Sequence, residues 1–172
     1  MLSLDVKEDI LAIGCDNLII LYSLKLMKSV SFCDFAHSNL VTNVRFKSNS
    51  TEKISQQKDV NGHYLLSGGE DGIINLFTVE QGLGEDSVVN TVNPNQSLSN
   101  IGFLDENMKF IDFTTCVQTY CVYSFDNYLP YFEFDAKSVR NTYKIKEVFN
   151  TDYIIDRYYD ASKQIVELYC GN

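Results

Sequence analysis

The stretch YLLSGGEDGIINLFTV, residues 64–79, decides the fold of this chain, because a related stretch, LAIGCDNLIILYSL, occurs at residues 11–24. Each stretch contains a turn that leads into an apolar run. In both, an acidic residue is followed six positions later by an aromatic one: Asp71 by Phe77, and Asp16 by Tyr22. Self-similarity at a fixed spacing is typical of repeat architectures, in which one structural unit is used several times.

The rest of the chain consists of short apolar runs separated by turn residues, without the 3.6-residue period that marks a helix. With 11 Tyr and 11 Phe, it is rich in aromatic residues, which favour strands. Many short strands with frequent turns are typical of a sandwich, a barrel or a propeller. We therefore expect an all-β fold with strands at residues 2–6, 10–14, 18–24, 29–33, 41–46, 63–67, 73–79, 87–92, 99–104, 109–114, 119–125, 131–134, 153–159 and 164–170.

The strands that end each repeat are apolar on both sides, and this favours a propeller. A sheet with one face in water would alternate between apolar and polar residues. Blades stacked around an axis bury both faces of each sheet. The aromatic residues that end the repeats lie 55 and 46 residues apart, whereas a blade takes about 40–45 residues; they are Tyr22, Phe77 and Tyr123. We interpret the polar segment 47–62 as a loop inserted in the longer interval.

Residues 36–80 resemble one complete repeat of the WD40 family. The histidine of the family's Gly-His dipeptide is matched by His37, which follows Ala36. The Trp-Asp dipeptide that ends the family's repeat is replaced by Phe77 and Thr78. The resemblance implies a β-propeller of four-stranded antiparallel blades.

A narrower resemblance is to the WD repeat-containing protein 89 group. It rests on residues 71–77, on the acidic stretch 84–93 and on residues 99–103, because a similar acidic linker follows the same blade in that group. Residues 153–172 are similar to a strand pair of the next blade in the group.

The WD40 resemblance implies a structural hydrogen-bond network of His37, Ser67 and Asp71, in which the imidazole bridges the carboxylate and the hydroxyl. Such a network satisfies buried polar groups. Ser, His and Asp also form hydrolase triads, but no Gly-x-Ser-x-Gly elbow occurs, so we expect no catalytic residue. The third repeat has Val117-Gln118 in place of Asp-Gly and no preceding histidine. We expect the other blades to rely on apolar packing and strand pairing.

We expect residues 1–172 to form a single partial β-propeller. Closed propellers have about 4–8 blades, and this chain offers about three and part of a fourth. An open array of blades leads us to expect either self-association or missing blades from a longer chain. The expected blade remnants are residues 1–34, 37–92, 97–134 and 150–172.

The composition limits the partners. The chain has 23 acidic and 14 basic residues, a net charge of −9, which repels phosphate backbones and anionic lipid surfaces. We therefore expect neither direct nucleic-acid binding nor membrane binding. An odd number of cysteines and an acidic N-terminus predict an intracellular protein, cytoplasmic or nuclear. We expect no cofactor and no metal, since Cys116 and Cys121 lack the Cys-x-x-Cys spacing.

The WD40 resemblance implies a non-catalytic scaffold that mediates protein–protein interactions, with protein or peptide partners. An alternative is a component of a nuclear, ribosome-associated or chromatin-associated assembly, in which the acidic chain binds basic protein segments. A propeller enzyme is the least favoured hypothesis, because the sequence has only two histidines to build a catalytic cluster.

Overall fold

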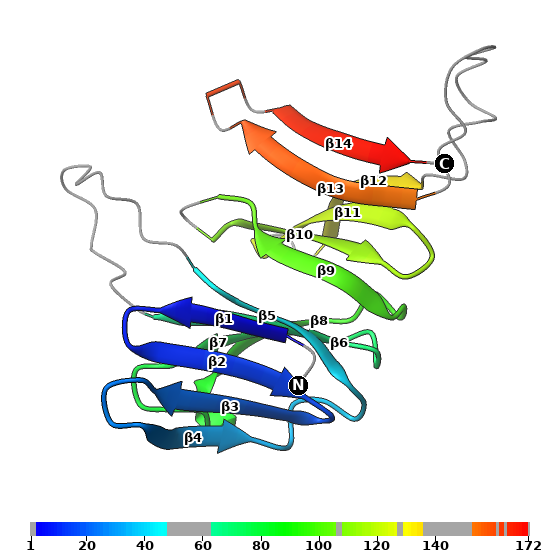
Figure 1. Cartoon of the computed structure of the whole chain (residues 1–172). Helices are drawn as coiled ribbons and strands as arrows, with labels where there is room; N and C mark the ends of the chain where they lie inside the picture. Colours follow the sequence, from blue (N-terminus) through cyan, green and yellow to red (C-terminus); the bar gives the residue numbers. More distant parts are fainter. Residues whose placement is uncertain are drawn as a thin grey trace, which may run out of the picture.

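The computed structural model describes residues 3–47, 63–105, 108–126, 129–135, 153–160, 162–163 and 165–171. Within these residues the chain forms three four-stranded antiparallel sheets and one two-stranded sheet (Figure 1). The expected all-β architecture of propeller blades in an open ring is confirmed. Residues 48–62 of the expected inserted loop and residues 150–152 of the expected last blade remnant lie outside the described residues.

Each sheet is an antiparallel meander, since strands that follow one another in the chain are neighbours in space. The first contains β1 (Ser3–Lys7), β2 (Ile10–Cys15), β3 (Leu18–Ser23) and β4 (Lys28–Cys33). The second contains β5 (Val41–Phe46), β6 (Tyr64–Gly69), β7 (Ile74–Thr78) and β8 (Val88–Val92), with the 3-10 turn η1 (Glu85–Ser87) before β8. The third contains β9 (Leu98–Phe103), β10 (Phe110–Thr115), β11 (Thr119–Ser124) and β12 (Leu129–Asp135). The fourth pairs β13 (Tyr153–Asp160) with β14 (Ile165–Gly171).

The first strands of consecutive sheets lie side by side, β1 next to β5 and β5 next to β9. Polar side chains join β1 to β5: Ser3 Oγ accepts from Val44 N at 3.0 Å, and Asp5 Oδ2 accepts from Phe46 N at 2.7 Å. The Thr42 hydroxyl donates to Leu98 O at 3.0 Å and so joins β5 to β9. These strands form the inner wall of the open ring.

Both faces of the second sheet are buried, as the apolar runs predict. Adjacent residues of a strand point to opposite faces, so Leu65 packs into a core against the first sheet and Leu66 into a core against the third. The same holds for Phe77 and Leu76 on β7. One apolar sheet therefore supplies half of two separate cores.

The aromatic residues that end the second and third repeats point toward the preceding sheet. Phe77 pairs with Leu65 and is fully buried in the core against the first sheet. Tyr123 pairs with Ile111 and packs against the core between the second and third sheets. Tyr22 occupies the same place in the first sheet and is half-buried.

Candidate interaction site

The structure brings His37, Ser67 and Asp71 together. His37 lies in the connection between β4 and β5, Ser67 on β6, and Asp71 in the turn between β6 and β7. The His37 Nε2 atom is 2.7 Å from Ser67 Oγ, and its Nδ1 atom is 3.1 Å from both carboxylate oxygens of Asp71. Asp71 also accepts hydrogen bonds from the backbone of Ser38 at 2.9 Å and of Ile73 at 3.1 Å. The network thus connects the turn to the segment that enters the second sheet.

The buried imidazole of His37 is neutral. Burial lowers the pKa of His37 below its usual range, against the opposing effect of the Asp71 carboxylate. A neutral imidazole has one donor and one acceptor nitrogen. We therefore assign the proton to Nδ1, which donates to Asp71, while Nε2 accepts from the hydroxyl of Ser67.

Ser67, His37 and Asp71 are linked in the same order as the residues of a hydrolase triad, but they are buried away from any substrate. Ser67 and the side chain of His37 are 0% exposed. Both nitrogens of His37 are already engaged within the protein. A nucleophile must reach the reacting atom of its substrate, so the hydroxyl of Ser67 is not placed for catalysis.

Asn75 provides a second link around the same connection, which the sequence analysis did not identify. Its buried amide donates to Ala36 O at 2.9 Å and accepts from Thr91 Oγ1 at 2.7 Å. The segment that carries His37 is therefore fixed to both β7 and β8.

Asp112 on β10 forms another buried network, between the third and fourth sheets. Its carboxylate accepts from the Tyr120 hydroxyl at 3.1 Å. It also forms a bidentate ion pair with Arg157 of β13, through Nη2 to Oδ1 at 3.0 Å and through Nε to Oδ2. The side chains of Arg157 and Asp112 are 13% and 4% exposed. The expectation that blades other than the second rely on apolar packing is therefore wrong for the third.

The environment favours the protonated forms of Tyr120 and Arg157. Burial, together with the Asp112 charge, raises the pKa of Tyr120 well above its usual range. Burial opposes the charge of Arg157, but the hydrogen bonds and charge of Asp112 outweigh it and raise the pKa of Arg157. Gly102 leaves room for the guanidinium, since a Cβ there would lie 2.6 Å from Arg157 Nη2.

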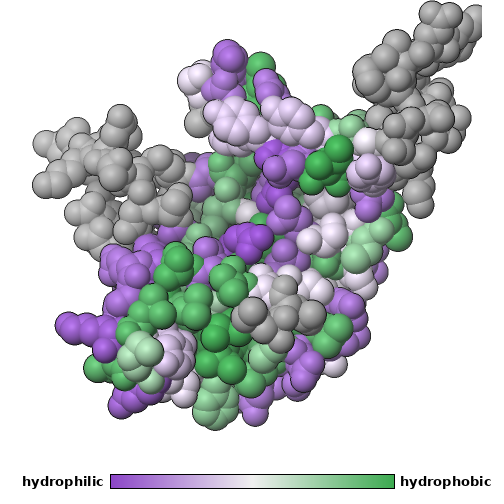
Figure 2. All heavy atoms as spheres, in the orientation of Figure 1, coloured by the Kyte–Doolittle hydropathy of each residue, from purple (hydrophilic) through white to green (hydrophobic). Residues whose placement is uncertain are grey.

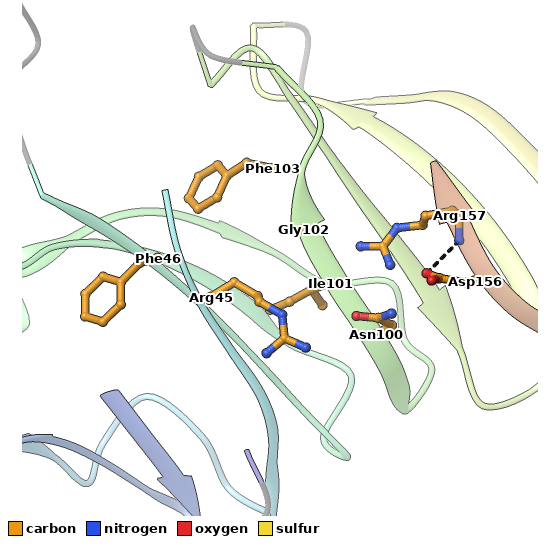
Figure 3. Close-up of a pocket in the computed structure, with 8 residues that line it drawn as sticks. All are labelled: Arg45, Phe46, Asn100, Ile101, Gly102, Phe103, Asp156 and Arg157. Carbon is orange, nitrogen blue, oxygen red and sulfur yellow. Dashed lines mark hydrogen bonds between the residues drawn. The ribbon is translucent and has the colours of Figure 1, made fainter. Parts of the chain in front are cut away.

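The inner wall of the ring contains a pocket of about 350 Å³ (Figure 3). Three strands from three sheets contribute to it: β5, β9 and β13. The side chain of Arg45 extends from β5 toward β9, and Asn100 lies on β9 on the side toward Asp156. The lining residues are Arg45, Phe46, Asn100, Ile101, Gly102, Phe103, Asp156 and Arg157.

Arg45 is the cation that this pocket offers to a ligand. The charge of Arg157 is balanced by Asp112. Arg45 donates from Nη1 to Val44 O at 2.8 Å, and within the described part of the chain this is the only hydrogen bond of its side chain. A guanidinium carries five N–H donors in a planar fork that matches a carboxylate. The pocket therefore combines spare cationic donors with the apolar side chain of Phe103, while the ring of Phe46 packs against the core between the first and second sheets.

Three findings concern other kinds of site. The described residues contain no group of three or more His, Cys, Asp or Glu side chains that could hold a metal ion. No helix among them is long and apolar enough to cross a membrane. The five cysteines are all free thiols, and burial raises the pKa of Cys121 to about 12, so this thiol stays protonated.

The meander sheets with their inner strands side by side define a WD40-type β-propeller, present here as an open ring. The chain is similar to the WD repeat-containing protein 89 homolog of Dictyostelium discoideum, with 28% identity over 165 residues. It is 27% identical over 157 residues to the WD repeat-containing protein GTS1 of Arabidopsis thaliana. The recognised resemblance to WD40-repeat proteins and to the WD repeat-containing protein 89 group is thus confirmed.

These matches cover 95% and 87% of this chain but 43% and 35% of the relatives, so the chain spans less than half of their length. No family model matches the chain. Among solved structures, a chain of the mitotic checkpoint complex crystal structure matches 73% of this chain and 34% of its own length, with a TM-score of 0.56 and 13% identity. At that identity the match supports the fold alone.

Proposed function

We propose that this chain is a non-catalytic scaffold that binds protein segments, and that the pocket on its inner wall is one of the places where they bind. The propeller fold and the WD repeat relatives support an interaction role in general. The observation that carries the specific proposal is Arg45, a guanidinium with spare donors at a concave site. A concave pocket with a few convergent polar groups is the usual form of a binding site.

The chemistry of the pocket favours a segment with an acidic side chain. A carboxylate accepts two parallel hydrogen bonds from a guanidinium, and Arg45 has those donors free. Phe103 offers apolar surface to the residues beside that carboxylate. The net charge of −9 disfavours the approach of an anionic segment, so we expect short segments with one acidic residue to bind better than acidic runs.

A binding assay on paired peptides tests this proposal. Short peptides with one Glu between apolar residues are compared with twins in which that Glu is Gln, by fluorescence anisotropy against the whole chain. A charged hydrogen bond contributes about 1.5–3 kcal/mol, so we expect the Gln twin and the Arg45→Gln variant to bind about tenfold to a hundredfold more weakly. The matched control is Lys109→Gln, which removes an exposed cation outside the pocket. Equal binding of the twins, or equal affinity of the two variants, would contradict the proposal.

The alternative partner, a basic protein segment, is supported by the charge of one rim of the propeller. The turns between second and third strands and the connections between sheets meet at this rim, which carries the exposed acidic residues Asp16, Asp34 and Glu70. No Lys or Arg occurs in its described ranges, which are residues 15–18, 34–40, 70–73, 93–97 and 116–118. Such a rim attracts cationic segments, as a nuclear, ribosome-associated or chromatin-associated assembly would require.

The same assay with Lys-rich peptides separates the two partner classes. Binding at the rim should weaken steeply with salt and should be reduced in the double variant Asp34→Asn/Glu70→Gln, while Arg45→Gln leaves it unchanged. Lys-rich peptides that bind the double variant as well as the wild type would contradict this alternative. Location in the cytoplasm or nucleus stays a prediction, as does the absence of catalysis.

A further inference from the structure

The half-buried side chain of Asn100 on β9 has hydrogen-bonding groups that the fold does not use. Its amide offers two donors and an acceptor oxygen, and within the described part of the chain no hydrogen bond engages them. Among the described residues no buried side-chain nitrogen or oxygen lacks a partner, so this amide is open at the surface of the pocket. Buried asparagines of the second sheet differ, since Asn43 donates to Thr42 Oγ1 and Asn75 to Ala36 O, both at 2.9 Å. The amide of Asn100 is therefore available to a ligand.

The available groups of Asn100 and Arg45 lie on the two sides of β9 (Figure 3). Arg45 extends toward β9 from β5, whereas Asn100 lies on the side toward Asp156 of β13. In the orientation of Figure 1, Figure 2 shows hydrophilic side chains gathered near β9 and β13, whereas hydrophobic side chains cover much of the first sheet. A single small anion would contact the guanidinium of Arg45 alone. A chain that lies across β9 would contact both side chains.

The side of the pocket next to β13 favours a neutral group of the ligand. The charge of Arg157 is balanced there by Asp112. Asp156 also lines this side, and its carboxylate would repel a second acidic side chain. The amide of Asn100 matches a peptide group, because it can donate to the C=O of that group and accept from its N–H. These backbone groups are bonded to one another inside a helix, whereas an extended segment offers them to its partner.

We propose that Asn100 binds the backbone of the partner segment and makes the pocket specific for an extended chain. The acidic side chain of that segment binds Arg45 on one side of β9, and one of its peptide groups binds Asn100 on the other side. The inference rests on the proposed function of the pocket and adds the conformation of the partner to its chemistry. Main-chain hydrogen bonds supply affinity without regard to sequence, and the carboxylate selects among the sequences.

A scan of N-methylated peptides tests the role of Asn100 by fluorescence anisotropy on the whole chain. Each peptide keeps the Glu and carries one N-methyl group, which removes one backbone N–H donor. One methylated position should bind the wild type about threefold to tenfold more weakly, as expected for the loss of a neutral hydrogen bond. Asn100→Ala should weaken binding of the unmethylated peptide by a similar factor, and the same methyl group should then have little further effect. N-methylation also changes the free peptide, but this change is common to both proteins and cancels in the comparison.

Asn90→Ala is the matched control, because Asn90 is also a half-buried asparagine on a strand, β8, and lies outside the pocket. It should bind every peptide as the wild type does, and both variants should keep the melting temperature of the wild type.

Two results would overturn the role of Asn100 alone. In the first, every methylated position weakens binding to the wild type and to Asn100→Ala equally. In the second, Asn100→Ala weakens binding no more than Asn90→Ala does. The preference for the Glu peptide over its Gln twin would persist in both cases, so the proposed function would stand. Loss of that preference, or the absence of binding by any peptide, would overturn both proposals.

Discussion

Replacing Asp112 by Asn tests how much the buried ion pair with Arg157 stabilises the fold. The carboxylate accepts from the Tyr120 hydroxyl and from two nitrogens of Arg157. An amide of the same size keeps one acceptor oxygen and turns an NH2 group toward a donor. The guanidinium then stays buried, 13% exposed, without its counter-charge.

The expected loss is large because breaking a buried pair costs more than the pair contributes. Removing one partner of a buried ion pair costs about 3–5 kcal/mol. For a chain of 172 residues, 1 kcal/mol shifts Tm by about 2–4 °C. We therefore expect Asp112→Asn to lower Tm by about 6–20 °C and the urea midpoint in proportion, with the slope of the transition unchanged.

Two further variants make the result specific. Asp156→Asn removes an exposed carboxylate next to Arg157 in the chain and should change the free energy of unfolding by less than about 0.5 kcal/mol. The double variant Asp112→Leu/Arg157→Met removes both charges and should recover most of the loss. Urea unfolding followed by circular dichroism measures the loss in free energy of unfolding for each variant. An equal loss for Asp112→Asn and Asp156→Asn would show that the ion pair is not desolvated and would contradict this prediction.

Three further predictions concern the second sheet and its contacts. His37→Ala should lower the free energy of unfolding by about 1–3 kcal/mol, because Asp71 loses its side-chain donor and the Ser67 hydroxyl loses its acceptor; an unchanged melting midpoint would contradict this. Folding lowers the pKa of His37, so the unfolded chain binds a proton more readily than the folded chain. The contribution of His37 to stability is therefore complete above a pH of about 6.5. It is lost as the pH falls below that value toward the pKa of the folded state. Stability curves from pH 5 to 8 should show this fall in the wild type and not in His37→Ala. Gly14→Ala should destabilise by about 1–3 kcal/mol, because its Cβ would lie 2.9 Å from Val41 O, whereas Gly84→Ala, with nothing within 4 Å, should be nearly neutral in the same melts.

The fold can be predicted from the sequence because the patterns that indicate it lie within short stretches of the chain. Adjacent apolar residues such as Leu65 and Leu66 indicate a sheet buried on both faces, and the cores confirm this. The turn at Gly72 has a φ of +76°, which favours glycine, and it is marked by the Asp-Gly dipeptide. Repetition of the pattern then predicts the blades.

The sites were less accessible, because they join residues that are far apart in the chain. His37 and Asp71 were linked through resemblance to a known repeat. Asp112 stands in an apolar run, FIDFTT, and a buried carboxylate requires a partner, but nothing local indicates Arg157, 45 residues further on. Arg45 contributes to a pocket only because three sheets bring β5, β9 and β13 together. Such contacts depend on how the sheets are placed against one another.

The second sheet alone supplies side chains to both apolar cores, and this has a consequence for cooperativity. The extensive contacts between sheets join neighbours in the chain, as in linear repeat proteins. Stability in such an array is a sum over neighbouring units, so local opening starts in the outer units. Native-state hydrogen exchange should therefore be slowest for the amides of β6 and β7 and faster for β4 and β14. We expect local openings of the outer sheets to precede the cooperative unfolding that the melting temperature reports.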